Sequence, residues 1–176
     1  MSYLNDNNFL KIIAKSLPLT ILFIAVFNEF DANNFGIPFL SFNFAYILIF
    51  FWTLKKIEYF GYGFIFLAGI INDVVTGAPI GLSSFCYMII CVATSYFRSI
   101  TLRPNITKDW FFFLITISLV NSTYYIIFSY FFNSDIDYRF LLTNNFATFL
   151  IFFLFYYIFN IYYKIFFGKS DVWCKW

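Results

Sequence analysis

Charged residues, histidine and cysteine are all scarce in this chain of 176 residues. Only 11% of the residues are charged, whereas soluble domains carry roughly 25%. Histidine is absent, which removes the commonest general base and the commonest metal ligand. The three cysteines, Cys86, Cys91 and Cys174, include no Cys-x-x-Cys pair, so the sequence supports neither a disulfide framework nor a zinc site. These absences predict no catalytic residue, no metal and no cofactor.

Apolar residues dominate the chain instead. They make up 62% of it and include 30 Phe and 14 Tyr. A chain of this composition cannot hide its apolar surface inside one soluble core, so we expect an integral membrane protein. The length of 176 residues leaves room for about six helices of roughly 20 residues each. The expected fold is therefore all-α, a polytopic helical bundle that forms a single transmembrane domain over residues 1–176.

Polar and turn-forming residues divide the chain into six apolar segments. The predicted spans cover about residues 13–30, 39–54, 59–75, 81–97, 110–132 and 142–166. The two arms of the 59–97 hairpin have about 16 residues each, or roughly 24 Å of helix, against a hydrocarbon core of about 30 Å. Six spans is the prediction, and four spans with a re-entrant 59–97 hairpin is the alternative.

Basic residues predict the orientation of these spans. If the N-terminus is cytoplasmic and the spans alternate, ten of the eleven basic residues lie inside and Arg139 alone lies outside. The positive-inside rule then places both termini in the cytoplasm. The inner set is Lys11, Lys15, Lys55, Lys56, Arg98, Arg103, Lys108, Lys164, Lys169 and Lys175. Tyr156, Tyr157, Tyr162 and Tyr163, near the inner end of the last span, are predicted interfacial anchors, with a functional aromatic cage as the alternative.

Five of the seven glycines fall between Gly61 and Gly81, around one acidic residue in an apolar run. Gly69, Asp73, Gly77 and Gly81 follow one another at intervals of four residues. A continuous helix would place the first three on one face. Small residues on that face let another helix come close, and an ionisable group at membrane depth indicates a function. These four residues are the predicted site for partner binding or helix packing.

Asp73 lies about 13 residues into the third predicted span, which is roughly 20 Å deep in a regular helix. Three roles are open to it. It can accept hydrogen bonds from backbone N–H groups freed by a break between Thr76 and Gly81. It can face a cleft that receives a partner helix or a small cation. It can also couple the transport of protons or substrate.

Other polar and turn residues are predicted to support this site. The Thr76-Gly77-Ala78-Pro79 stretch ends one helix, and Pro79 is preset for the turn that starts the next. Asn72 and Thr76 are predicted polar supports beside Asp73. Asn72, Asn121 and Asn160 can also bridge helices by hydrogen bonds within the membrane.

The ordered Gly69-x3-Asp73-x3-Gly77-x3-Gly81 combination, at the junction of the third and fourth spans, resembles the signature of the MreD family. MreD proteins are rod shape-determining proteins of the bacterial inner membrane. The resemblance implies six spans and a non-enzymatic role in the elongation machinery, which regulates cell shape and peptidoglycan synthesis. It implies binding to MreC, a single-pass protein with a periplasmic coiled coil. Indirect partners would be the MreB filament, a RodA-like glycosyltransferase and a penicillin-binding transpeptidase.

A second class of function stays open beside this one. MreD-like proteins resemble the substrate-binding S-components of energy-coupling-factor vitamin transporters in fold. Those subunits typically carry an Ala-x3-Ala pattern on the first span, where this chain has Ala14, Pro18 and Ala25. The alternative prediction is therefore a vitamin-transporter subunit, in which Asp73 would be a pocket residue.

Overall fold

The described part of the chain is entirely helical. The computed structural model describes residues 16–27, 42–56, 61–101, 105–132 and 138–167. Within these ranges there are six helices and no strand, so the predicted all-α class is confirmed. The helices are an N-terminal helix (Ser16–Phe27), α2 (Phe44–Lys56), α3 (Tyr62–Thr76), α4 (Leu82–Ile100), α5 (Ile106–Phe132) and α6 (Tyr138–Phe167).

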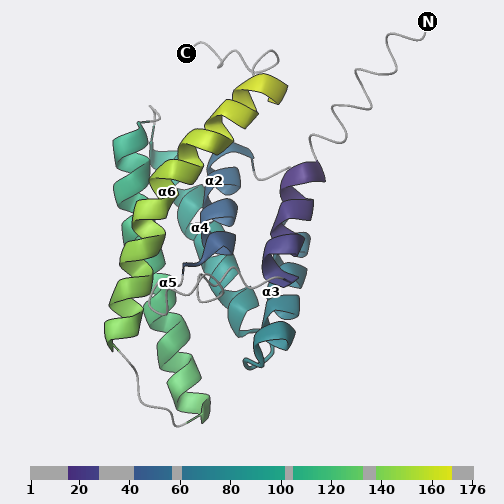
Figure 1. The fold of residues 1–176 in the computed structure, drawn as a ribbon, viewed down its shortest axis with the longest axis vertical. Coiled ribbons are helices and arrows are strands. Elements are labelled where there is room, and N and C mark those ends of the chain that lie inside the picture. Colours follow the sequence, from purple (N-terminus) through teal and green to yellow (C-terminus); the bar gives the residue numbers. More distant parts are fainter. Residues whose placement is uncertain (1–15, 28–41, 57–60, 102–104, 133–137, 168–176) are drawn as a thin grey trace, which may run out of the picture.

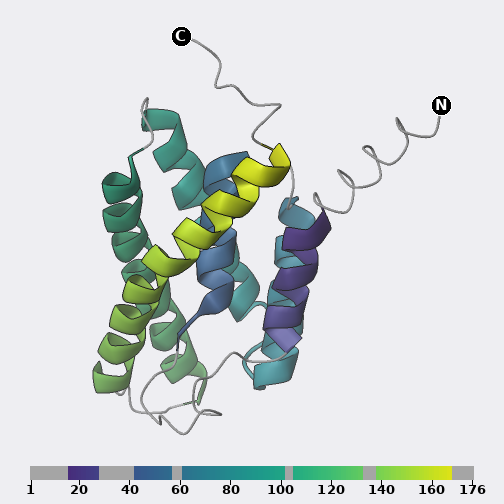
Figure 2. The same ribbon diagram turned by 45° about the horizontal axis from the view of Figure 1, so that its top comes forward.

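Consecutive helices run in alternating directions along one bundle (Figures 1 and 2). The N-terminal helix begins at the top of the bundle in Figure 1. Helices α2, α4 and α6 have their C-termini there. We call this the upper end and the opposite one, where α3 turns into α4, the lower end. Helix α3 packs mainly on α4, α4 also contacts α2 and α5, and α6 contacts α5 and α2.

The helices differ in length, which bears on how they relate to a membrane. Helices α5 and α6, with 27 and 30 residues, are long and apolar enough to cross one. The N-terminal helix, α2 and α3 are apolar but shorter. With 15 residues, α3 spans about 22 Å, less than a hydrocarbon core of about 30 Å. The long α5–α6 pair extends past α2 at the lower end (Figure 1).

The helix ends follow local capping rather than hydropathy alone. Helix α5 begins at Ile106, four residues before the predicted start of the fifth span, because the Asn105 side chain accepts a hydrogen bond from the Thr107 N–H at 3.2 Å. Helix α2 begins only at Phe44, and residues 42–43 before it are not helical. The remaining parts of the predicted spans, at 13–15, 28–30, 39–41 and 59–60, lie outside the described residues.

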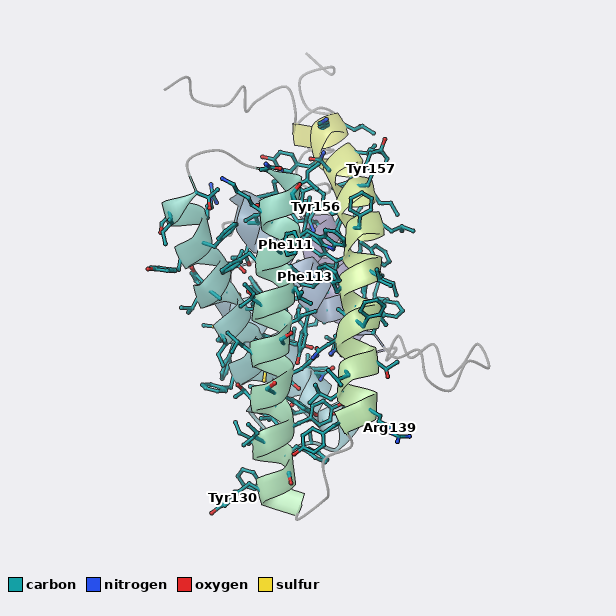
Figure 3. All side chains as sticks on the ribbon, turned by 90° about the vertical axis from the view of Figure 1, so that its left-hand side faces the viewer. Phe111, Phe113, Tyr130, Arg139, Tyr156 and Tyr157 are labelled. Atoms are coloured by element: carbon teal, nitrogen blue, oxygen red, sulfur yellow. The ribbon has the colours of Figure 1, made fainter. Side chains whose placement is uncertain are left out.

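Aromatic layers fill the centre of the bundle. The Phe113 ring of α5 stacks on Phe152 of α6 with centroids 4.1 Å apart, and Phe50 of α2 meets Phe113 edge-on at 4.9 Å. Phe113 lies in the interior beside α6 in Figure 3. Trp110 stacks on Phe149 at 4.3 Å and donates its indole N–H to the Phe149 carbonyl at 3.0 Å. These contacts join α5 and α6 at residues 110–113 and 149–152, and α2 at Phe50.

The exposed surface of the bundle is apolar, unlike that of a soluble protein. Large apolar side chains are exposed along α5 and α6, among them Ile115, Leu119, Ile126, Phe146, Phe153 and Leu154. The interior of the same pair buries Asn121, Asn145 and Thr148. An apolar outer surface suits a hydrocarbon environment, and the polar groups that are buried there bond to one another.

Candidate functional site

Two glycines with positive φ form the turn between α3 and α4. Gly77 ends α3 with φ 68°, and its N–H donates to the Asp73 carbonyl. Gly81 precedes α4 with φ 99°. A Cβ at either position would meet nothing within 4 Å, so space does not limit these residues. Their backbone conformation does, because L side chains disfavour the left-handed region.

The Asp73 side chain caps the start of α4. Its Oδ2 accepts a hydrogen bond from the Gly81 N–H at 2.7 Å, and its Oδ1 accepts one from the Ser83 N–H at 2.9 Å. The residue is fully buried. The carboxylate thus satisfies N–H groups that have no partner within α4 and places negative charge at the positive end of the helix dipole. Of the three roles open to Asp73, the structure shows the first, in which the side chain accepts backbone hydrogen bonds. Gly81 lies within the predicted stretch from Thr76 to Gly81, and Ser83 lies two residues beyond it.

Gly69 lets α3 and α4 approach closely above the turn. A Cβ built on Gly69 would lie 2.4 Å from Ser84 Cα and 2.5 Å from the Ser84 nitrogen, which is backbone that cannot rotate away. The Ser84 hydroxyl donates across the interface to the Phe66 carbonyl at 2.8 Å. The Asn72 amide donates to the Ser83 hydroxyl at 2.9 Å, which confirms that Asn72 bridges two helices.

The structure separates the four motif residues into two groups. Gly69 and Asp73 face α4, while Gly77 and Gly81 shape the turn. The supporting Thr76 is exposed and donates to the Asn72 carbonyl at 2.8 Å, a bond within its own helix. The carbonyl of Pro79 accepts from the Leu82 N–H at 3.1 Å as α4 begins. Binding of a partner by the motif stays a prediction.

Ser83 and Ser84 are contributors to this junction that sequence reasoning missed. Both are buried, and each connects α4 to α3 through a hydrogen bond of its hydroxyl. The signal was present, since two small hydroxyl residues lie two and three positions after the last motif glycine, at the start of a helix.

A second polar group links α5 and α6 to Asn43, the residue directly before α2. The Asn121 amide donates to Asn145 Oδ1, and the Asn43 amide donates to Asn121 Oδ1 at 3.2 Å. The Asn43 N–H also donates to the Thr148 hydroxyl at 3.2 Å, which donates to the Asn144 carbonyl at 2.7 Å. The predicted bridging by Asn121 is confirmed. The sequence signal for its partners was the Thr-Asn-Asn run at 143–145 inside an apolar span.

Asn160, the third asparagine proposed to bridge helices, lies partly buried on α6. None of the hydrogen bonds found between side chains of the described residues involves Asn160.

A third group of polar and aromatic side chains lies near the upper end and joins α2, α5 and α6. The Tyr156 hydroxyl donates to Asp109 Oδ2 at 3.3 Å, and Asp109 is 2% exposed. Lys55 Nζ lies 5.9 Å from the ring centroids of Phe51 and Tyr156 and 5.6 Å from that of Tyr163. The aromatic rings of α6 therefore surround a cation of the same chain.

The Asp73 side chain joins α3 to the start of α4. Both Asp73 oxygens accept backbone hydrogen bonds, and the side chain has no exposed surface. Among the described residues, no group of three or more His, Cys, Asp or Glu side chains is arranged to hold a metal ion.

No family model, curated protein or solved structure matches this chain. The resemblance to MreD proteins is thus carried by the four-residue motif and by its place between the third and fourth of six helices.

Proposed function

We propose that this chain is a multi-pass protein of the bacterial cytoplasmic membrane and a non-enzymatic scaffold of the cell-elongation machinery. In this role it binds an MreC-like single-pass protein and helps to position a RodA-like glycosyltransferase and a penicillin-binding transpeptidase. The observation that carries the proposal is the Gly69-x3-Asp73-x3-Gly77-x3-Gly81 motif, which joins α3 to α4. Both termini are placed in the cytoplasm, and the six helices act as six spans.

Support for the membrane location comes from α5 and α6 and from the outer surface. Both helices are long and apolar enough to cross a bilayer, and their exposed side chains are largely apolar. Arg139 lies at the lower end, away from the other basic residues of the described helices (Figure 3). That separation agrees with an upper end in the cytoplasm.

Support for a scaffold role comes from the outer face of α3. The polar groups at the junction bond within the α3–α4 pair, so the pair is a preassembled unit. Its free face carries exposed Leu67, Val74 and Val75, together with Gly63, which has no neighbour within 4 Å of a Cβ position. A rigid apolar face with a small residue suits a partner's membrane helix.

Affinity purification in mild detergent tests the proposal. The tagged protein is extracted from its own membrane and its partners are identified by mass spectrometry. Recovery of a coiled-coil single-pass protein with wall-synthesis enzymes supports the scaffold. Recovery of paired ATPases with a membrane coupling subunit would instead make the chain a transporter subunit.

Two matched leucines sharpen this test. Leu67 on α3 and Leu150 on α6 are both 50% exposed, so replacing either by Gln removes a similar apolar contact with the surroundings. We expect Leu67→Gln to reduce recovery of the single-pass partner about tenfold, since loss of one well-packed contact costs roughly 1–2 kcal/mol. Leu150→Gln should leave recovery unchanged. Equal recovery with both variants would place the partner elsewhere.

A further inference from the structure

Helix α2 begins within the bundle, and two of its first N–H groups are open. The helix has 13 residues from Phe44, whereas α5 and α6 extend past its start toward the lower end (Figure 1). The Ile47 N–H donates to the Asn43 carbonyl at 3.4 Å. The two N–H groups before it, those of Ala45 and Tyr46, have no acceptor within the part of the chain that the structure describes. The start of α2 therefore presents free donors at the positive end of a helix dipole.

Asn43 stands where a capping residue would close this helix, but its side chain bonds elsewhere. A capping side chain accepts from the N–H two or three positions further along, which here belong to Ala45 and Tyr46. The Asn43 amide instead donates to Asn121 Oδ1 of α5 at 3.2 Å. None of the hydrogen bonds between described residues uses Asn43 Oδ1 as an acceptor. The cap is thus diverted to a neighbouring helix, and the donors of α2 stay open.

Two asparagine amides of α6 lie beside the start of α2 and are also open. The Asn43 N–H donates to the Thr148 hydroxyl at 3.2 Å, and that hydroxyl lies 3.3 Å from Asn144 Oδ1. Asn121, which bonds to Asn43, donates to Asn145 Oδ1. Asn144 and Asn145 are only 5% and 7% exposed, yet their Nδ2 groups have no acceptor among the described residues. Burying an amide N–H without an acceptor costs free energy, so these donors favour an acceptor that enters the bundle.

We propose that the start of α2, together with the Asn144 and Asn145 amides, binds an oxyanion, the carboxylate or phosphate group of a ligand that enters from the lower end. Helix N-termini bind such groups, because their N–H groups point at the oxygens and the helix dipole favours negative charge. Membrane transport proteins place the N-termini of short helices against anionic substrates in the same way. The α6 amides add donors from a second direction. The site depends on neither the motif at the α3–α4 turn nor the role in cell elongation.

Thermal unfolding of the full-length protein in detergent tests this site. The unfolding temperature is measured while inorganic phosphate, succinate or phosphatidylglycerol is added, with sodium chloride used to match the ionic strength of all samples. We expect at least one of the three to raise the unfolding temperature with a saturable dependence on concentration, because a ligand that binds only the folded state stabilises it. A saturable rise with none of the three would overturn the proposal.

Two substitutions of Asn144 separate anion binding from folding. Asn144→Leu should weaken binding of the same anion about tenfold, since it removes a hydrogen bond to a charged group. Asn144→Asp keeps the size of the side chain and the oxygen near Thr148, but in mildly alkaline buffer it sets a negative charge against the ligand. The saturable rise should therefore disappear in Asn144→Asp. Wild-type affinity in that variant would overturn the proposal.

Two control variants distinguish this site from other polar and charged residues. Asn160 is a partly buried asparagine further along α6, and Arg139 is exposed at the lower end (Figure 3). Asn160→Leu and Arg139→Gln should each leave the affinity for the anion unchanged. A loss in Arg139→Gln as large as that in Asn144→Leu would place the anion on the surface, and the proposal would then be wrong.

The three anions also show where the oxyanion comes from. A saturable rise with phosphatidylglycerol alone assigns the site to a lipid headgroup, and a rise with phosphate or succinate assigns it to a soluble compound. Either result agrees with the proposed site. Recovery of the single-pass partner is measured separately by affinity purification, so failure of this site and failure of the scaffold role are told apart.

Discussion

The α3–α4 pair and the α5–α6 pair are both antiparallel, yet they are held together by different means. In the first pair backbone meets backbone, with Gly69 against Ser84 and the Asp73 carboxylate on two N–H groups of the next helix. In the second pair side chains meet, with Phe113 stacked on Phe152 and Asn121 bonded to Asn145.

The difference lies in how many residues share the contact energy. In the α3–α4 pair the close approach depends on one glycine and the start of α4 on one carboxylate, so we expect single substitutions at these two residues to be costly. The α5–α6 pair distributes its contacts over several side chains, with three ring pairs and three hydrogen bonds between residues 109–121 and 145–156. We therefore expect the first pair to be sensitive to single changes and the second to tolerate them.

The largest effect is expected from Gly69→Leu. Because its Cβ would lie 2.4 Å from Ser84 Cα, the two helices must separate, at a cost of about 3 kcal/mol or more of the free energy of unfolding. Thermal unfolding of the purified protein in detergent measures this loss. Gly63→Leu is the matched control, because nothing lies within 4 Å of a Cβ there, and it should leave stability unchanged. Equal stability of both variants would contradict the close contact at Ser84.

Loss of the Asp73 carboxylate should come next. Asp73→Leu leaves the Gly81 and Ser83 N–H groups without their acceptor, which we expect to cost about 2–4 kcal/mol of the free energy of unfolding. Asp73→Asn keeps one acceptor oxygen and should lose about half as much. Thr76→Ala, which removes a bond within α3 only, should change stability by less than about 0.5 kcal/mol.

The amount of protein in the membrane and the recovery of the single-pass partner are then compared for the Asp73 variants. A drop of both in parallel agrees with a capping role. Loss of the partner at unchanged stability would show instead that Asp73 acts on the partner directly.

The smallest effect is expected in the α5–α6 pair. Asn121→Leu or Asn145→Leu alone should cost about 1 kcal/mol, as hydrogen bonds between membrane helices usually do. The double variant should lose little more than either single variant, because both partners of the bond are removed together. Unfolding in detergent measures all three, with Asn160→Leu as a control. Additive losses would show that the two amides act independently.

Local signals in the sequence predicted the α3–α4 turn well. The glycines and Pro79 predicted a break after residue 75 and a new helix at 81, and α3 ends at Thr76 while α4 begins at Leu82. Turn residues act through their own backbone preferences, so their effect is readable without a fold. The same reasoning placed Asp73 beside the freed N–H groups.

Contacts across helices were harder to predict. The equal spacing of Gly69, Asp73 and Gly77 suggested one continuous face, whereas Gly77 leaves the helix in a left-handed conformation. Nothing in the spacing showed that Ser84 would fill the space opposite Gly69. Helix α5 also begins at Ile106, within the predicted loop, and not at residue 110. Its first turn is polar, but the Asn105 cap stabilises it as helix.

By itself the sequence determined the all-α class, the apolar exterior and the position of the turn, because composition and backbone preference act residue by residue. The tertiary structure alone decided which polar groups meet. Asn43, directly before α2, meets Asn121 of α5, which in turn bonds to Asn145 of α6. Such groups depend on the rotation and depth of each helix, which follow from packing against the others and are not encoded in any one segment.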